Sequence, residues 1–394
     1  MNHLALLLWV PLVAATAWIV AGLVAVLALT RRRPWLAPAP APVTVLKPLC
    51  GSDPGLRGNL ESFFRQDHPR FELVFGVTNA SDPALAVVAE LMRQYPQVHA
   101  RTVVHGGGGA LNPKVDNLLG MLPHARHELI LLSDSNVLAP RHYAREMASV
   151  YDRERRGLVT NLFAGIGERS LGAALENVGL AGFVAAGLAL PTALGDGVLL
   201  GKSVLFSRHE LDRLGGLRRF SDVLAEDFVM AQTFVHGGGR IAVAPTVLAN
   251  VTGDMSVRAT LARQLRWSML RCRATPFAHL LEPIASPLAL LPLAYWLMGP
   301  ASLGWAGVLL VVRDVGGWLA LRGTSSLHLP VLLAPLRELL ALAVWCAAPL
   351  KRHVAWRGKR FRLGAGTLLY LDQVEVTQGG RGERRRRVSR ASAA

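Results

Sequence analysis

The stretch Glu-Leu-Ile-Leu-Leu-Ser at positions 128–133, which ends at Asp134, decides the fold class of this 394-residue chain. Its four consecutive apolar residues predict a strand buried in the interior. A short polar segment, Asp134-Ser135-Asn136, follows directly. The chain therefore places a carboxylate at the end of a buried strand.

Similar strand signals lie on the N-terminal side of this stretch and alternate with helical ones. Residues 43–46, 71–77 and 98–104 are rich in β-branched and aromatic residues, whereas residues 59–65 and 84–95 have apolar positions at helical spacing. This alternation predicts an α/β domain with a mostly parallel, Rossmann-like sheet covered by helices on both faces. Ligands of such sheets bind beyond the carboxyl ends of the strands, where Asn79, Asp82 and Asp134 fall.

Apolar blocks at both ends of the chain predict membrane helices. Residues 4–30 carry no charge and are followed by Arg31-Arg32-Arg33, and about 20 apolar residues suffice to cross a bilayer. The basic residues follow the apolar run and the run is long, so residues 1–33 are expected to be an uncleaved transmembrane anchor and not a signal peptide. The proline-rich residues 34–42 are expected to form a semi-rigid linker.

The second apolar block, residues 283–350, is expected to hold the C-terminal membrane helices. Arg313-Asp314 and Arg337-Glu338 interrupt it, and charges inside a membrane need partners or a cavity. Two or three crossings both fit this pattern. Residues 43–282 form the predicted catalytic domain and residues 351–394 a basic tail. Within the domain, the apolar residues 179–200 are expected to border an acceptor pocket or lie at the membrane interface.

The net charge of +16 does not indicate a nucleic-acid partner. Basic residues flank the apolar blocks, as at Lys351-Arg352, and positive charge beside a membrane segment marks its cytoplasmic side. The sequence contains no motif typical of a nucleic-acid-binding domain. The apolar fraction of 51% and the mean hydropathy of +0.32 agree with an integral membrane protein whose domain faces the cytoplasm.

Two segments after strands are candidates for a nucleotide and metal site. Asp134 can hold a divalent cation against a diphosphate, with Asn136 as a further oxygen ligand, because hard cations take oxygen ligands. Asp82, with Asn79 beside it, can accept hydrogen bonds from a base or ribose. The alternatives are an ordinary turn at residues 134–136 and a helix start at Asp82-Pro83.

Two further segments can supply a phosphate contact and a general base. Lys114 follows a run of four glycines, which is compatible with phosphate contact but equally with a mobile loop before a helix. Asp227, next to Glu226, lies in an apolar stretch, and a carboxylate there can serve as general base toward an alcohol. Acidic residues at a helix start are the alternative.

Arg263, Arg266 and Trp267 lie in a basic segment. At helical spacing these three side chains share one face, so two arginines and an indole can hold a diphosphate leaving group and stack on an acceptor. The alternative is an amphipathic helix at the membrane surface whose arginines reach into water.

Taken in order, these segments resemble the ceramide glucosyltransferase family, which shares the GT-A nucleotide-sugar fold with the processive glycosyltransferases. Bacterial hopanoid glycosyltransferases are nearly as similar. The resemblance rests on Leu46-Lys47-Pro48-Leu49 with Gly51 and Asp53-Pro54, Asp82-Pro83, Asn112-Pro113-Lys114 with Asn117-Leu118, Asp134-Ser135, Gly215-Gly216, Ala225-Glu226-Asp227 with Met230-Ala231, Arg263-x-x-Arg266-Trp267 and Glu282-Pro283-Ile284.

The resemblance implies a role for each candidate. Asp82 and Asn79 would contact the base or ribose, Lys114 the donor nucleotide, and Asp134 the metal-bound nucleotide. Asp227 would be the catalytic base, and Arg263, Arg266 and Trp267 would hold the diphosphate and the acceptor. Two departures from the family stand out: Asn136 replaces the second acid of a D-x-D motif, and residues 180–200 contain no histidine, which the animal enzymes carry before Gly201.

These inferences predict an inverting hexosyltransferase that uses a UDP-sugar, with glucose favoured, and Mg²⁺ or Mn²⁺. The expected acceptor is the hydroxyl of a ceramide-type lipid, and the expected location is a bacterial inner membrane with the catalytic domain on the cytoplasmic side. The alternatives are a UDP-N-acetylglucosamine-dependent hopanoid glycosyltransferase, a polysaccharide synthase and a membrane scaffold without activity.

Overall fold

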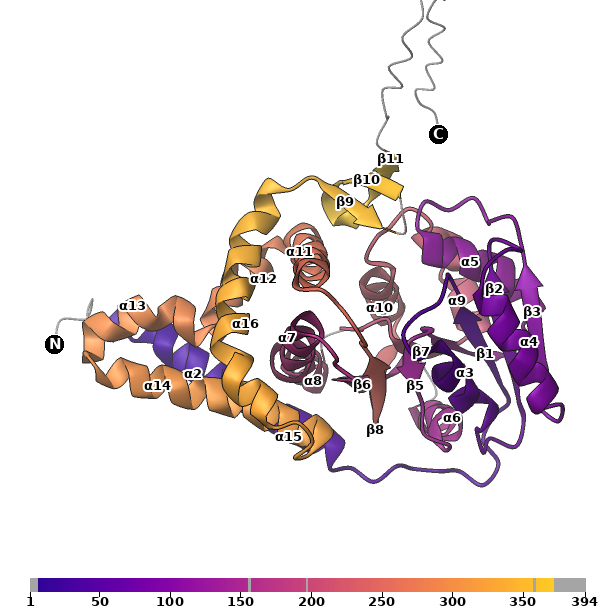
Figure 1. Cartoon of the computed structure of the whole chain (residues 1–394), viewed down its shortest axis with the longest axis horizontal. Helices are drawn as coiled ribbons and strands as arrows, with labels where there is room; N and C mark the ends of the chain where they lie inside the picture. Colours follow the sequence, from indigo (N-terminus) through magenta and orange to yellow (C-terminus); the bar gives the residue numbers. More distant parts are fainter. Residues whose placement is uncertain (1–5, 155–156, 196–197, 357–358, 372–394) are drawn as a thin grey trace, which may run out of the picture.

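The computed structural model describes residues 6–154, 157–195, 198–356 and 359–371. An α/β domain lies at one end of the molecule and an elongated bundle of apolar helices at the other (Figure 1). The helix α16 (His328–Ala347) runs between them.

The first half of the eight-stranded sheet is parallel. Its strands are β1 (Val43–Pro48), β2 (Phe71–Val77), β3 (Ala100–Val104) and β4 (Leu129–Ser133), in the spatial order β3-β2-β1-β4. Each of the three pairings is parallel, with Val43 opposite both Phe71 and Leu129. The predicted α/β class is confirmed here, and the carboxyl ends of these strands meet at one edge.

The second half of the sheet is mixed, which the strand pattern did not predict. It continues from β4 through β7 (Ser203–Ser207), β6 (Gly157–Ile166), β8 (Arg240–Val251) and β5 (Val137–Leu138). The strand β7 is antiparallel to both β4 and β6, whereas β6 and β8 are parallel. Because β7 runs opposite to β4, its first residues lie beside the carboxyl end of β4.

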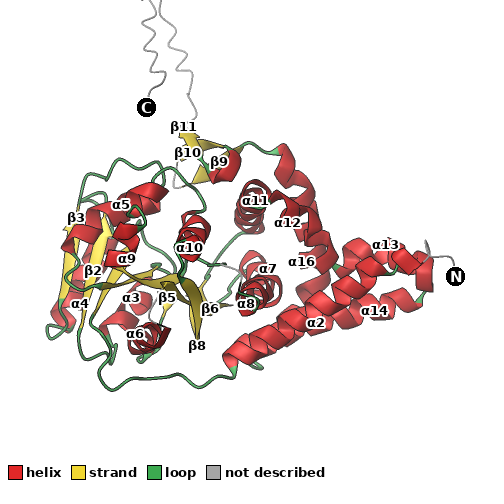
Figure 2. Cartoon of the chain, turned by 180° about the vertical axis from the view of Figure 1, so that it is seen from behind, coloured by secondary structure: helices red, strands yellow, loops and turns green. Residues whose placement is uncertain are grey.

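Helices cover both faces of the sheet, as predicted (Figure 2). One layer contains α3 (Leu56–Phe64), α4 (Ala84–Gln94) and α6 (Tyr143–Glu154), and the other contains α5 (Pro113–Met121) with the short η1 (Leu122–His124), α9 (Arg208–Arg213), η3 (Leu217–Phe220) and α10 (Glu226–His236). Leu129 and Leu131 pack into the first layer, and Ile130 and Leu132 into the second. Both faces of β4 are therefore buried, which explains its uninterrupted apolar run.

The proline-rich linker is held against the catalytic domain. The Ala37 amide donates to Ser149 Oγ at 2.9 Å, and Arg145 Nε donates back to the Ala37 carbonyl oxygen at 2.9 Å. The His68 ring lies 3.1 Å from the Ala41 carbonyl oxygen. These contacts fix the path from the anchor helix to the first strand.

Within the described residues, four helices are long and apolar enough to cross a membrane. They span Val10–Thr30 (α2), Leu171–Ala193, Ala301–Arg322 and His328–Leu350, and the bent pair Pro276–Ala285 with Pro287–Met298 can form a fifth span. Gly299 and Pro300 separate α13 (Pro287–Met298) from α14 (Ala301–Leu310), and α15 (Gly316–Arg322) continues α14 through the π-helical turn η5 (Val311–Val315).

The segment Leu171–Ala193 differs from the other candidate spans because it is enclosed by protein. It comprises α7 (Leu171–Gly179), the π-helical turn η2 (Leu180–Val184) and α8 (Ala185–Ala193). Of its most apolar window, 72% is buried, against 22% for the window in His328–Leu350. This helix therefore lies between the sheet and the membrane helices, and its apolar character serves protein packing.

The end of the described chain forms a second, three-stranded antiparallel sheet. Its strands are β9 (His353–Trp356), β10 (Lys359–Leu363) and β11 (Leu369–Leu371), with the short helix η7 (Ala365–Thr367) before the last strand. The sequence assigned these residues to a basic tail. The arginines at 384–387 lie outside the described residues.

The remaining helices connect the catalytic domain to the bundle. The helix α11 (Val257–Ala274) leads into α12 (Pro276–Leu281) and η4 (Glu282–Ala285), and η6 (Ala348–Leu350) follows α16. The two layers at the sheet and the helices around α11 thus enclose the carboxyl edge of the sheet, where the candidate site residues lie.

Candidate active site

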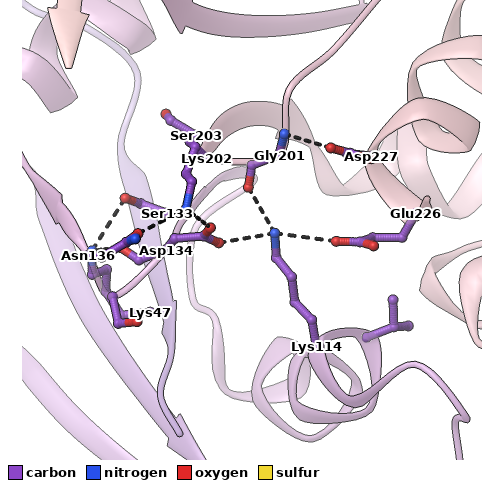
Figure 3. Close-up of polar contacts among 12 residues, drawn as sticks. Lys47, Lys114, Ser133, Asp134, Asn136, Gly201, Lys202, Ser203, Glu226 and Asp227 are labelled. Carbon is purple, nitrogen blue, oxygen red and sulfur yellow. Dashed lines mark hydrogen bonds and ion pairs between the residues drawn. The ribbon is translucent and has the colours of Figure 1, made fainter. Parts of the chain in front are cut away.

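Asp134 lies directly after β4 and is paired with two lysines (Figure 3). Its Oδ1 is 3.1 Å from Lys114 Nζ, and its Oδ2 is 3.1 Å from Lys202 Nζ. The Asp134 side chain keeps 25% of its surface exposed, so a ligand can reach this pair of contacts. The carboxyl end of β4 therefore carries a charged site that is accessible to ligands.

Lys114 is placed by the cap of α5. Asn112 Oδ1 accepts hydrogen bonds from the Lys114 and Val115 amides at 2.9 and 3.1 Å, and Pro113 occupies the first helical position. Asn112 and Pro113 are the residue types preferred at these positions. From here the Lys114 ammonium group donates to the Gly201 carbonyl oxygen at 2.8 Å and lies 3.4 Å from Glu226 Oε1.

Glu226 and Asp227 form the first turn of α10 and reach the two groups that Lys114 connects: Glu226 contacts Lys114 itself, and Asp227 contacts Gly201. Asp227 Oδ2 accepts a hydrogen bond from the Gly201 amide at 2.8 Å, and Glu226 Oε2 accepts one from Asn112 Nδ2 at 3.0 Å. A Cβ atom at Gly201 would lie 2.9 Å from Asp227 Oδ2, so only glycine allows this approach. The structure brings Asp134, Lys114 and Asp227 together through Gly201.

The charges of the site shift one another's proton affinity. Burial alone would raise the pKa of Asp134, but the Lys114 and Lys202 ammonium groups outweigh it and hold that pKa well below its usual value. Burial raises the pKa of Glu226. Burial also lowers the pKa of Lys202. Acids and bases with shifted pKa values that lie close together are typical of functional sites.

Two lysines of this site were missed as site residues in the sequence. Lys47 is fully buried at the end of β1; its ammonium group donates to the Asp134 carbonyl oxygen at 2.6 Å and lies 3.7 Å from the Phe63 ring centroid. Lys202 also donates to Asn136 Oδ1 at 3.1 Å. Each of these lysines adjoins an apolar strand in the sequence. Because a buried charge requires a partner, this position could have indicated that each lysine pairs with an acid at the same edge of the sheet.

Asn79 and Asp82 lie at the same edge of the sheet, beyond β2, but their present contacts are structural. Asp82 accepts hydrogen bonds from the Gly51 and Ala84 amides, both at 2.9 Å, and Asn79 accepts one from the Ser81 amide at 3.0 Å. The helix-start interpretation of Asp82-Pro83 describes this geometry. A role toward the donor base remains a prediction.

Arg263, Arg266 and Trp267 lie on α11, which packs against α7. Arg263 Nε is 3.3 Å from Glu176 Oε1, and its guanidinium carbon lies 5.0 Å from the Trp267 ring centroid. Burial and the nearby positive charge of Arg263 both lower the pKa of Lys202. Arg266 and Trp267 are half-buried, and Trp267 packs against the core of the catalytic domain.

Asp134 and Asn136 supply only two oxygen groups toward a metal ion. Among the described residues, no three His, Cys, Asp or Glu side chains are grouped so that they could hold a metal. Mg²⁺ is commonly bound by one or two carboxylates together with substrate phosphates. The donor set therefore fits a cation only if a diphosphate provides further ligands.

An α/β domain with lysines and carboxylates at the carboxyl edge of its sheet is joined here to apolar helices, an architecture that fits a membrane-associated transferase acting on a nucleotide sugar. The family model described as "Glycosyl transferase family 21" matches residues 7–369. The chain belongs to this family and is a hexosyltransferase, and the predicted α/β domain with apolar helices toward both ends of the chain is confirmed.

Known relatives agree with the predicted resemblance. The chain is 27% identical over 335 residues to ceramide glucosyltransferase 1 of Caenorhabditis elegans, a match covering 82% of this chain and 72% of the relative. It is 29% identical over 337 residues to ceramide glucosyltransferase 3 of the same organism, covering 82% and 73%. The chain is thus a glycosyltransferase of the ceramide glucosyltransferase type, and these relatives give no support to the hopanoid alternative.

Among solved structures, the chain is similar to a mannosyltransferase from Pyrobaculum calidifontis in complex with GDP-mannose and Mn²⁺. The two share 20% sequence identity and superpose with a TM-score of 0.48, covering 87% of this chain and 99% of the other.

Proposed function

We propose that this membrane protein transfers glucose from UDP-glucose to the hydroxyl group of a ceramide-type lipid, with inversion at the anomeric carbon. One observation carries the proposal: Lys114 and Gly201 join Asp134 and Asp227 into one site, although these residues are far apart in the sequence. A site for a diphosphate and a carboxylate suited to act as a base are thereby adjacent.

The reaction is a single displacement. The Asp227 carboxylate accepts the proton of the lipid hydroxyl while its oxygen forms a bond to the anomeric carbon. The bond between that carbon and the diphosphate oxygen breaks, and the electron pair leaves with UDP. Because one displacement inverts configuration, an α-linked donor gives a β-glycoside.

The residues around Asp134 would stabilise the departing UDP. The ammonium groups of Lys114 and Lys202 would lie where negative charge develops on the departing diphosphate. Electrostatic stabilisation of such charge is the largest single contribution to the rate enhancement of many enzymes. Asp134 and Asn136 would hold Mg²⁺ or Mn²⁺ against the diphosphate, and the ion would add positive charge there. Arg263, Arg266 and Trp267 would hold the diphosphate and the acceptor end, and Asn79 and Asp82 the base or ribose.

The arrangement of the helices supports a lipid acceptor and a cytoplasmic active site. Arg31, Arg32 and Arg33 follow α2 and precede the catalytic domain, and positive charge beside a span marks the cytoplasmic side. Phe277 and Leu280 on α12, which follows α11, and Trp296 on α13 are exposed apolar side chains. Apolar side chains at these positions would allow a lipid to approach the site within the membrane plane.

Purified protein incubated with ceramide and a UDP-sugar tests the proposal. We expect UDP release that depends on ceramide, a monohexosyl lipid as product and a β-linkage by NMR. UDP-N-acetylglucosamine should be a poorer donor than UDP-glucose. A polymeric product, an α-glycoside or no transfer to any lipid would contradict the proposal.

A further inference from the structure

Glu176 is a buried carboxylate that has no part in the proposed reaction, although it lies close to the candidate site. Its side chain has 0% of its surface exposed and belongs to α7, between the sheet and the membrane helices. A carboxylate sealed from water is costly unless a positive charge and hydrogen-bond donors compensate it. The partners of Glu176 therefore indicate what its charge serves.

Both partners come from neighbouring positions of α11. Glu176 Oε1 is 3.3 Å from Arg263 Nε, and Glu176 Oε2 accepts a hydrogen bond from Gln264 Nε2 at 2.7 Å. The Arg263 side chain keeps 19% of its surface exposed, whereas its acid partner keeps none. The ion pair is therefore one-sided: the anion is fixed inside the protein, and the cation lies at the edge of the enclosed region.

Close contacts near the start of the two helices set this meeting. Thr260 Oγ1 donates to the Gly172 carbonyl oxygen at 2.8 Å. A Cβ atom at Gly172 would lie 2.2 Å from the Met255 carbonyl oxygen, so α7 comes this close only because glycine occupies the position. One turn further along each helix, Glu176 faces its two partners on α11.

Arg263 is one of the residues that the proposed function assigns to the diphosphate. Burial lowers the pKa of Lys202, and the nearby charge of Arg263 lowers it further. Lys202 in turn contacts Asp134, where the departing diphosphate is proposed to lie. The contact with Glu176 uses Nε, so the terminal nitrogens of the guanidinium can donate to a diphosphate.

We propose that Glu176 is a positioning residue for Arg263: it holds Nε from inside the protein, so that the guanidinium stays directed at the diphosphate. The inference rests on the proposed function, because it specifies how that site keeps one of its positive charges in place. A charge fixed before the ligand arrives stabilises the departing diphosphate without the cost of reorienting a flexible side chain. Without Glu176, the partly exposed arginine would be free to turn toward solvent.

The negative charge of Glu176 has an opposite effect, which makes the inference testable. This charge weakens the attraction of the site for a diphosphate, because like charges repel. If Glu176 acted only through its charge, a neutral residue in its place would tighten UDP binding. If it acts by positioning, the same replacement weakens UDP binding, because the guanidinium loses its fixed orientation.

Glutamine variants at both positions of the ion pair test the inference. Glu176→Gln, Arg263→Gln and the double variant are compared in UDP and uridine binding by calorimetry, with the melting temperature as a check on folding. Uridine lacks the diphosphate and reports on the rest of the donor site. Glu168→Gln is the matched control, because the Glu168 side chain is only 9% exposed and contacts an arginine elsewhere, Arg322 on α15, at 3.0 Å.

We expect Glu176→Gln to weaken UDP binding about threefold to tenfold, as for one lost hydrogen bond. Uridine binding, and the UDP affinity of Glu168→Gln, should stay unchanged. In the Arg263→Gln background, Glu176→Gln should cause no further loss, because the residue acts through that arginine. Unchanged or tighter UDP binding in Glu176→Gln, or losses that multiply in the double variant, would overturn the inference.

Arg263→Lys keeps the inference testable if Glu176→Gln does not fold. Lysine keeps the charge but lacks the planar group that can contact Glu176 on one edge and a diphosphate on the other, so UDP binding should weaken about threefold to tenfold. Wild-type affinity in Arg263→Lys would overturn the inference alone. Unchanged UDP binding in Arg263→Gln would refute the diphosphate role that the proposed function gives to Arg263, and the inference with it.

Discussion

The active site and a second charged group both bury opposite charges, but they differ in how firmly those charges are fixed. The second group, called here the membrane-side cluster, lies between the apolar helices and consists of Arg313, Asp314, Arg337 and Glu338. At the active site, Lys114 is 19% and Asp134 25% exposed, and the one lysine is shared between acids on different elements. In the cluster, Asp314 is fully buried and Arg337 only 10% exposed, and each arginine contacts both acids.

This difference separates two tasks within one molecule. The partly exposed lysines can exchange a carboxylate for a diphosphate, because water and ligands reach them. The membrane-side cluster cannot exchange partners at acceptable cost, since a buried charge without a partner is strongly unfavourable.

Asp227→Asn is expected to have the largest effect on the active-site side of the comparison. Loss of a general base typically lowers the rate by about 10² to 10⁴, so kcat should fall in this range. UDP binding, measured by calorimetry, should change less than about twofold, because asparagine can still accept from the Gly201 amide. The exposed Asp212→Asn serves as control. Loss of UDP binding in Asp227→Asn would instead make Asp227 a donor-binding residue.

Glu338→Leu tests the fixed side of the comparison. It leaves two buried arginines with a single acid, and breaking a buried pair costs about 3–5 kcal/mol of folding free energy. The double variant with Arg337→Leu should recover most of that loss, because the Arg313–Asp314 pair remains balanced. Thermal unfolding in detergent measures both. If Glu338→Leu is as stable as the wild type, the buried arginines do not depend on Glu338 as a partner.

Lys114→Met removes the exchangeable charge. A charge-assisted hydrogen bond contributes about 1.5–3 kcal/mol, so the KM for the UDP-sugar should rise roughly tenfold to a hundredfold. The exposed Lys351→Met is the matched control and should leave the KM unchanged. If both variants behave alike, Lys114 does not contact the donor.

Thr367→Val tests a smaller effect that links the C-terminal sheet to the base. The buried Thr367 adopts a φ of 64°, and its carbonyl and hydroxyl oxygens accept hydrogen bonds from the Leu224 and Ala225 amides at 2.9 and 3.3 Å. This holds the segment just before Asp227. We expect kcat to fall about threefold to tenfold, as for one lost hydrogen bond, with the KM for the donor unchanged.

Restoration by Thr367→Ser would assign the effect of Thr367→Val to the hydroxyl group. The melting temperature of Thr367→Val should stay near that of the wild type, because the valine keeps the shape of the side chain. A parallel fall in kcat and melting temperature would mean that Thr367 only supports folding.

His68 lies in neither region and gives the smallest expected effect. Burial lowers its pKa from 6.5 to about 4, so the folded protein favours the neutral ring. Below pH 6.5 the unfolded chain binds a proton at His68 that the folded protein does not bind until about pH 4. The free energy of unfolding is therefore highest above pH 6.5 and decreases as the pH falls toward 4. Between pH 7 and 5 the wild type should lose roughly 2 °C more in melting temperature than His68→Gln. Equal losses would contradict this.

The parallel half of the sheet followed from the sequence, but the other half did not. In β4 every residue is buried, so the apolar run was unambiguous. In β10 the sequence Lys-Arg-Phe-Arg-Leu alternates exposed basic residues with buried Phe361 and Leu363, and its charges resembled those of a basic tail. The strand β7 pairs antiparallel with β4, and such a long-range pairing leaves no local pattern.

The same limit applies to the site. Asp134, Lys114 and Asp227 were predicted because acids and a lysine at element ends are recognisable locally. Lys202 and Lys47 are recognisable as site residues only through their contacts with Asp134, which lies 68 and 87 positions away along the chain. Their pairing depends on the order of strands, which the local pattern did not reveal.

Mass spectrometry of lipids from cells that express the chain tests the central claim most directly, namely that Asp227 and the Asp134 site act together on a lipid hydroxyl. The account predicts a new monohexosyl lipid with an amide in cells carrying the wild-type chain, and none in cells carrying Asp227→Asn at equal protein level. The same lipid in both strains, or a hexose polymer in place of a glycolipid, would contradict it.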